Sequence, residues 1–490
     1  MNMGDTKQSM FCVECLGIRK LPPLGKCGWG MLILLLLFAG FLRGWRLSEP
    51  FENAGDERYY IEAACSYWRG TKDLNTEHPP LGKIMIADGI RSCMWLRSKG
   101  FDVNNALCAR VVPLSFGMGI VLLTFLLGYR VSGGSLTVAE LATFLVATDF
   151  MSITFSRQAV LDPILSFWVL LGCFCGWLYL ESKDRGRGSF VLALACAASF
   201  AIAFSTKWIG LVCATVTWFF MVFSSGVGSA NFADDDNSTD GIMDTSLPST
   251  SAEASQNMAL SKTSLKNVII SAGVLFCLFF TVIASIYIVS YTPQFLREGF
   301  TVSTVSSIFS EYMRFVTWRY GSMDTSVASP FWLWPLGIRP LFSNVHYTAR
   351  YGYVLFHGGS IIFWWPGFLF TIKYFITGIK QKRFNWVFIT SIWLANWLIW
   401  ILATGGGFIH YMLPGIPFMA IVMAWVIEKW AHEQRRKLVG LYFFMLSTAL
   451  AIYYPALTFL PIRIDLCPIL FPSWFINLLA LLRAVLYGGS

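Results

Sequence analysis

Long apolar stretches alternate with shorter polar ones along the chain. Runs of about 20 apolar residues recur from near one end to the other, and a helix of that length crosses about 30 Å of hydrocarbon. Continuous runs exclude a β-barrel, whose strands alternate between apolar and polar positions over about 10 residues. The pattern predicts an all-α polytopic membrane protein with about 11–12 transmembrane helices, at residues 29–47, 106–129, 136–155, 160–180, 189–206, 208–225, 267–290, 353–378, 385–403, 408–428, 438–459 and 470–487.

Three longer polar segments separate these runs. Residues 48–105 and 291–352 are aromatic and amphipathic, which is typical of loops that carry interfacial helices. Residues 226–266 are rich in Ser, Thr, Asp and Asn and predict a disordered linker. The expected organisation is an N-terminal segment (1–28), a catalytic transmembrane module (29–225), the linker (226–266) and a C-terminal transmembrane module (267–490).

Basic residues indicate which side of the membrane each loop faces. The segment before the first apolar run is basic and has no small-residue cleavage site, so we interpret the run as an uncleaved signal anchor with a cytoplasmic N-terminus. The short loops ESKDRGRG, KQKRF and EKWAHEQRRK then all face the cytoplasm, where Lys and Arg are concentrated. The linker is cytoplasmic too, so the Asn237 glycosylation pattern is discounted, whereas 48–105 and 291–352 face outward.

The composition agrees with this class and excludes others. Charged residues make up only 13% of the chain, about half the roughly 25% of a soluble domain. The net charge of +9 is explained by the cytoplasmic loops, so no nucleic-acid partner is expected. Cys12, Cys15 and Cys27 have no fourth ligand nearby, which argues against a closed structural zinc site.

Ionisable residues gather on the outward side. The first outer loop carries Asp56, Glu57, His78 and Lys83. Further candidates fall at the outer ends of the predicted helices or in the second outer loop: Arg110, Arg157, Asp162, Lys207, Arg339, His357 and His410. Charged groups at membrane depth are costly and usually functional. Each has an ordinary explanation, such as a helix cap or a snorkelling lysine, but their shared side predicts one active site open to the outer leaflet.

The residue types suggest the chemistry of that site. A carboxylate can take a proton from an incoming nucleophile, and Arg or Lys can stabilise the charge that develops on a phosphate leaving group. The outer face offers no ATP or nucleotide sugar, whereas lipid phosphates are available there. We therefore expect transfer of a group from a polyprenyl phosphate to an acceptor hydroxyl.

The motifs around these residues resemble the protein O-mannosyltransferase family, within the multi-pass lipid-phosphate-sugar glycosyltransferases of the C-type fold. DERYYIEAACSYWRG is similar to the family's Asp-Glu motif, and EHPPLGKIMIADG to its His-Pro-Pro-Leu-Gly-Lys motif, the most specific match. The blocks ARVVPLSFG, SRQAVLDPILSFW, AFSTKWIGL, SPFWLWPLGIRP, GGSIIFWW and HYMLPGIPF resemble later parts of the family in the same order. The likeness covers nearly the whole chain.

The resemblance implies a function and roles for individual residues. It implies transfer of mannose from a dolichyl- or polyprenyl-phosphate donor to Ser or Thr of a secreted or membrane protein, by direct displacement with inversion. Asp56 would be the general base and Glu57 would position the acceptor or the sugar. Arg110 would bind the donor phosphate, with Lys83 and Arg157 as weaker candidates, and His78 would orient the site.

Three departures from the family pattern bear on specificity. The second outer loop, with about 60 residues, is too short for the soluble β-trefoil domain of eukaryotic members, which favours a bacterial or minimal form. Asp324 stands near where members often have a His, so acceptor or sugar recognition could differ. His357 makes the approach to the glycine pair in LFHGG more polar than expected.

Two other functions remain open from the sequence. A glycolipid acceptor would keep the fold and the donor. A transporter or flippase is disfavoured, because such sites lie near the midplane between repeated halves and no repeat is visible. No essential metal cofactor is expected. The location would be the plasma (inner) membrane in a bacterium, or the endoplasmic reticulum membrane in a eukaryote.

Overall fold

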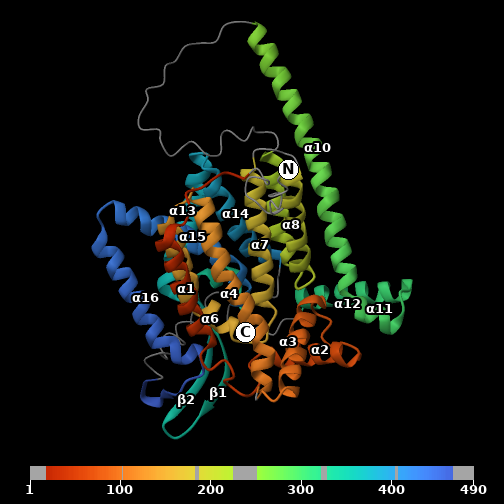
Figure 1. Cartoon of the computed structure of the whole chain (residues 1–490), viewed down its shortest axis with the longest axis vertical. Coiled ribbons are helices and arrows are strands. Elements are labelled where there is room, and N and C mark those ends of the chain that lie inside the picture. Colours follow the sequence, from red (N-terminus) through yellow and green to blue (C-terminus); the bar gives the residue numbers. More distant parts are fainter. Residues whose placement is uncertain are drawn as a thin grey trace, which may run out of the picture.

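The chain folds mainly into helices (Figure 1). The computed structural model describes residues 18–101, 103–182, 187–224, 251–321, 328–402 and 407–466. The α-helices are α1 (Gly25–Gly44), α2 (Glu57–Arg69), α3 (Leu81–Ser98), α4 (Asn105–Val131), α5 (Leu136–Thr148), α6 (Phe150–Ser156), α7 (Asp162–Glu181), α8 (Arg187–Phe204), α9 (Gly210–Ser224), α10 (Ser251–Ser290), α11 (Thr292–Glu298), α12 (Val302–Gly321), α13 (Ile361–Lys380), α14 (Phe384–Leu398), α15 (Ile416–His432) and α16 (Arg436–Leu457). Short 3₁₀ segments include η2 (Phe331–Leu336), η3 (Ile399–Leu402) and η4 (Ile409–Gly415).

The helices confirm a polytopic membrane protein. Among the described residues, 8 helices are long and apolar enough to cross a membrane, or 9 if the bent pair α5 and α6 forms one span. The shorter apolar helices α8 and α9 match two further predicted runs. The predicted span 470–487 and the segments 1–17 and 225–250 lie outside the described residues.

Burial separates a central helix from peripheral ones. Of the most apolar window of Ile409–His432, the segment formed by η4 and α15, 94% is buried inside the protein, against 11% for α10 and 17% for α16. A helix that is apolar all round belongs in a protein core or in lipid. We infer that α15 forms the centre of the bundle and that α10 and α16 present their side chains to lipid.

The prediction of a disordered linker is wrong for its last part. Helix α10 begins at Ser251, so it includes residues 251–266, and Figure 1 shows its first half extending beyond the bundle. The sequence SAEASQNMALSK is polar but contains Ala, Glu, Gln, Met, Leu and Lys, which have favourable helix propensity. Polarity alone therefore misled the prediction.

The predicted span 353–378 is wrong at its beginning. Residues Tyr351–His357 form β2, which pairs antiparallel with β1 (Leu341–Tyr347), and β3 (Ile462–Arg463) completes a three-stranded sheet in the order β1-β2-β3. The helix α13 starts only at Ile361. Short apolar runs rich in Tyr, Val and Phe fit a strand as well as a helix.

The elements from the two loops that are predicted to face outward gather at one end of the bundle. Helices α2 and α3 from the first outer loop, α11 and α12 from the second, and the β1–β2 hairpin all lie there (Figure 1). The helices agree with the prediction that both loops are folded. Nearby, the predicted span 136–155 is bent by 62° at Asp149, whose carboxylate accepts from the N–H of Ser152 and so caps α6.

Candidate functional site

Asp56 lies exposed at the first turn of α2. It is the residue directly before the helix, and its backbone carbonyl accepts from the N–H groups of Tyr59 and Tyr60. Gly55 precedes it with φ +55°, a left-handed conformation that L side chains rarely adopt. The chain thus turns sharply directly before Asp56, at the end of the bundle where both long loops lie.

Glu57, the next residue, is fully buried and points the other way. Its carboxylate forms a bidentate ion pair with Arg110, with both N–O distances at 2.7 Å. The same carboxylate accepts from the backbone N–H groups of Ala54 (2.6 Å) and Ala159 (2.7 Å). Four donors therefore surround Glu57 and hold the loop in place, and the expected role of Glu57 in positioning the acceptor or the sugar stays a prediction.

Arg110 uses all its donors inside the protein. Besides Glu57, its guanidinium donates to the backbone carbonyls of Leu47, Pro50 and Glu52 at 2.9–3.2 Å. Arg has five N–H donors, and five acceptors are present. We infer that Arg110 orders the loop that carries Asp56, and direct binding of the donor phosphate by Arg110 stays a prediction.

Arg157 is a candidate for phosphate binding whose N–H groups are not all used within the protein. It lies in the turn between α6 and α7 and donates to the carbonyls of Arg43, Trp45 and Arg46 at the end of α1. These three bonds leave two of its five N–H groups without an acceptor among the described residues. Arg157 is 3% exposed.

Two further ion pairs hold the turns around this region. Lys207, between α8 and α9, donates to both carboxylate oxygens of Asp162 at 2.8–2.9 Å, and both residues are buried. Lys83 donates to Asp73 and to the carbonyl of Asn75. Burial lowers the pKa of Lys83, and the negative charge of Asp73 opposes that effect. The candidates Asp162, Lys207 and Lys83 therefore all have internal partners.

Tyr60 lies near several of the candidate residues. It is buried, stacks on His78 with ring centroids 6.2 Å apart, and burial raises the pKa of its hydroxyl well above the ordinary value. The charges of Asp56, Asp162 and Glu77 raise it further. Tyr60 thus stays a neutral hydroxyl among carboxylates.

The β1–β2 hairpin packs against the loop that carries Asp56. The Nε2 atom of His357 lies 2.8 Å from the Ser343 hydroxyl and 3.4 Å from the Gln158 side-chain nitrogen. Asn344 donates to the carbonyl of Asn53, and Ser343 lies against Gly55. His357, which looked like an unexplained addition, is a buried part of this support.

The remaining candidates from the sequence are His410 and Arg339. His410 and His357 flank the ring of Phe155, with centroids 5.1 and 5.3 Å away. Arg339 has φ +61° and donates to the carbonyl of Ala328, so it orders the segment before β1.

Several contributing residues were not singled out from the sequence. Asp73 and Ser343 lie outside the blocks that resemble the family, whereas Tyr60 and Gln158 lie within such blocks but have no role assigned from them. A signal existed for two of them, because a buried lysine such as Lys83 requires an acidic partner and Tyr60 lies one helical turn after Asp56. Gln158 and Ser343 are joined only by the fold.

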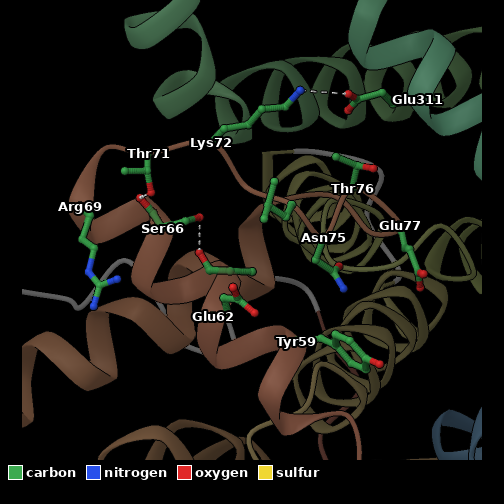
Figure 2. A pocket seen from close by; sticks show the side chains of 12 residues that line it. Tyr59, Glu62, Ser66, Arg69, Thr71, Lys72, Asn75, Thr76, Glu77 and Glu311 are labelled. Atoms are coloured by element: carbon green, nitrogen blue, oxygen red, sulfur yellow. Dashed lines mark hydrogen bonds and ion pairs between the residues drawn. The ribbon is translucent and has the colours of Figure 1, made fainter.

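A cavity of about 780 Å³ lies along α2, from Tyr59 to Arg69 (Figure 2). Its walls are one face of α2, the segment Thr71–Glu77 and Glu311 of α12. Lys72 crosses to Glu311 with an N–O distance of 3.7 Å. The volume is within the roughly 300–1,000 Å³ typical of ligand pockets. No group of three or more His, Cys, Asp or Glu residues suited to a metal ion occurs in the described part of the chain.

Part of the chain is similar in sequence to known protein mannosyltransferases. Residues 33–235 match the family model described as dolichyl-phosphate-mannose-protein mannosyltransferase. The dolichyl-phosphate-mannose–protein mannosyltransferase 1 of Candida albicans is 30% identical to this chain over 197 residues. The match covers 38% of this chain and 22% of the relative. The polyprenol-phosphate-mannose–protein mannosyltransferase of Mycolicibacterium smegmatis is 26% identical over 213 residues, 38% of each chain. The matched part thus spans well under half of these relatives.

Solved structures extend the likeness of fold. A chain of the Saccharomyces cerevisiae protein O-mannosyltransferase Pmt1-Pmt2 complex, bound to the sugar donor, matches with a TM-score of 0.67, 12% identity and coverage of 89% of this chain and 91% of that one. ArnT from Cupriavidus metallidurans, bound to undecaprenyl phosphate, matches with a TM-score of 0.53, 12% identity and coverage of 87% and 64%. The resemblance of this chain to the protein O-mannosyltransferases is therefore confirmed, by sequence over residues 33–235 and by fold over most of its length.

Proposed function

We propose that this protein transfers mannose from a polyprenyl-phosphate donor to a Ser or Thr hydroxyl of a protein, on the extracytoplasmic side of its membrane. The observation that carries the proposal is the position of Asp56. It is an exposed carboxylate on a loop fixed by the buried Glu57–Arg110 pair, within a chain that shares its fold with an O-mannosyltransferase bound to its donor.

The reaction is a single displacement. Asp56 takes the proton from the acceptor hydroxyl as its oxygen forms a bond to the anomeric carbon of mannose. The bond from that carbon to the phosphate oxygen breaks, and polyprenyl phosphate leaves with the electron pair. One attack inverts the anomeric carbon, from β-mannosyl phosphate to α-mannosyl protein, and needs no covalent enzyme intermediate.

Arg157 is the residue we assign to the leaving phosphate. Its two uncommitted N–H groups can donate to phosphate oxygens, and charge-assisted bonds of this kind are the strong ones. Arg110 contributes indirectly by fixing the loop. We propose that no metal ion is essential, because the arginine supplies the positive charge.

The assignment of membrane and acceptor belongs to the same proposal. The protein is an integral membrane protein; we place it in the inner membrane of a bacterium or in the endoplasmic reticulum membrane of a eukaryote. A glycolipid acceptor is the second candidate, because it needs no change of fold or donor; the fold shared with ArnT, whose structure holds undecaprenyl phosphate, supports the polyprenyl-phosphate donor for either acceptor.

The test is transfer of radiolabelled mannose by the purified protein. Polyprenyl-phosphate mannose is the donor and a Ser/Thr-rich peptide the acceptor. We expect label on the peptide with the wild type, and a loss of about 10²–10⁴-fold with Asp56→Asn, the range of general-base catalysis. Label on an added glycolipid but not on the peptide would replace the acceptor assignment, and equal rates for both proteins would remove Asp56 from its role.

A further inference from the structure

The cavity beside α2 is connected to Asp56 by the geometry of the helix. Tyr59, Ala63 and Ser66 line it at a spacing of three and four residues, which places them on one face of α2. Asp56 precedes Tyr59 by three positions and so continues the same face at the helix start. Asp56 does not line the cavity itself, but an extended ligand that leaves the cavity at Tyr59 can continue to the proposed base one helical turn away.

The length of this face fits a short stretch of polypeptide. From Asp56 to Arg69, α2 rises about 20 Å at about 1.5 Å per residue. An extended chain covers this distance in about six residues at about 3.3 Å each. The cavity is thus long enough for a peptide segment and larger than a single sugar ring requires.

Charged groups in the cavity are unevenly distributed. Glu62 is exposed and Glu77 is half-buried, and neither carboxylate has a hydrogen bond or an ion pair with another described residue. Lys72 is matched by Glu311. Figure 2 shows Glu77 and Tyr59 at one end, Arg69 at the other and Glu62 between them. The part nearer Asp56 is therefore acidic and the far end is basic.

We propose that this cavity binds the acceptor polypeptide and selects a Lys or Arg about three residues from the modified Ser or Thr. Glu62 lies about 9 Å along α2 from Asp56, given about 1.5 Å per residue, which corresponds to about three extended residues. Glu62 and Glu77 together bind the cation, and Arg69 favours an acidic residue about six positions away. The inference rests on the proposed function and adds a preference within its substrate class.

The acidic lining also decides against another occupant. An anionic lipid phosphate beside Glu62 and Glu77 would be repelled, because like charges disfavour binding. The donor phosphate therefore lies outside this cavity, on the side of Arg157. A cationic peptide, by contrast, gains attraction from the same two groups.

The test compares peptides that carry one Thr and either Lys or Ala three residues away, on either side. For the wild type we expect kcat/KM to favour the Lys peptide about five- to tenfold on the better side, since one exposed ion pair changes a binding constant by up to about fivefold. Glu62→Gln and Glu77→Gln should each reduce this ratio, mostly through KM, and together bring it near one. Asp88→Asn, an exposed carboxylate on α3 outside the cavity, should leave the ratio unchanged.

Photo-cross-linking locates the peptide independently of turnover. A benzoylphenylalanine beside the Lys should label residues 59–77 in the wild type, and less so in the double variant. A ratio unaffected by both glutamate substitutions, or labels confined to other segments, would overturn the inference while mannose transfer stood. Absence of transfer to every peptide would instead defeat the proposed function, and the cross-linking would still show whether a peptide occupies the cavity.

Discussion

The start of helix α2 and its outer face are built in opposite ways. At its start, Glu57 is fully buried and has four donors around its carboxylate. Along its outer face, Glu62 and Arg69 are exposed and line an open cavity. The buried end determines the position of Asp56 with little freedom, whereas the open face leaves its charges available to a ligand. The comparison separates residues that position the chemistry from residues that can select a substrate.

The same contrast separates two neighbours in sequence. Asp56 and Glu57 are both carboxylates in one motif, yet Asp56 is exposed and Glu57 is buried against Arg110. Removing one partner of a buried ion pair leaves an uncompensated charge, which is far more damaging than removing an exposed charge. The expected effect of a substitution therefore increases with the burial of the charged residue.

The largest effect is expected from Arg110→Ala. It removes the partner of Glu57 and leaves three backbone carbonyls without their donor, so we expect a loss of about 3–5 kcal/mol of stability and of most activity. Thermal unfolding in detergent and limited proteolysis of residues 48–105 measure it. Arg58→Ala is the matched control, because Arg58 is exposed on the same helix. Equal melting temperatures for the two variants would contradict the scaffold role of Arg110.

A smaller and more specific effect is expected from Arg157→Lys. Lysine keeps the positive charge but lacks the planar fork of five donors, so it cannot both hold the end of α1 and donate to a phosphate. We expect KM for the polyprenyl-phosphate donor to rise about tenfold, as for loss of one charge-assisted bond, while KM for the peptide changes little. Steady-state kinetics with each substrate varied in turn measure this. An unchanged donor KM would leave Arg157 as a helix cap only.

The third effect concerns pH. Burial lowers the pKa of His357 to about 4, below the roughly 6.5 of an unfolded histidine. Between these values the unfolded chain binds a proton that the folded chain does not, so stability is full above about pH 7 and falls as the pH decreases towards 4. The expected loss at pH 5 is about 2 kcal/mol.

Comparison with His357→Gln isolates this contribution. Glutamine keeps a polar group near Ser343 but does not titrate, so the difference in melting temperature between pH 7.5 and pH 5 should be smaller than in the wild type. The same pH dependence in both proteins would show that other groups cause it.

The smallest effect is expected from chelation. Treatment with EDTA should leave mannose transfer within about twofold of the untreated enzyme, since the proposed mechanism assigns the phosphate charge to Arg157. Complete loss of activity, restored by one divalent ion, would show that a metal supplies part of that charge.

The sequence predicted the membrane helices better than the elements at their outer ends. Continuous apolar runs report directly on spans, and α1, α4, α7 and α14 lie within a few residues of their predicted positions. The hairpin was missed because Tyr351–His357 reads equally well as a strand or as the start of a helix. The helical part of 251–266 was missed because its composition is polar.

The site was predicted by residue more than by role. Asp56, Glu57 and Arg110 were selected from the sequence. The sequence could not show that Arg110 forms an ion pair with Glu57, 53 positions away, and donates its other N–H groups to backbone carbonyls. Burial decides between a ligand-binding arginine and a structural one, and burial is a property of the fold. The contribution of Gln158 and Ser343 could not be predicted for the same reason, because the fold brings each of them to His357 Nε2.

The most direct test of the division between Asp56 and Glu57 measures stability and turnover together in Asp56→Asn and Glu57→Gln. The account predicts that Asp56→Asn keeps the melting temperature of the wild type within about 2 °C and loses mannose transfer about 10²-fold or more. Glu57→Gln should lower the melting temperature markedly, because it removes the charge that faces the buried Arg110. A stable Glu57→Gln with impaired turnover, together with an Asp56→Asn that unfolds early but retains its rate once folded, would contradict it.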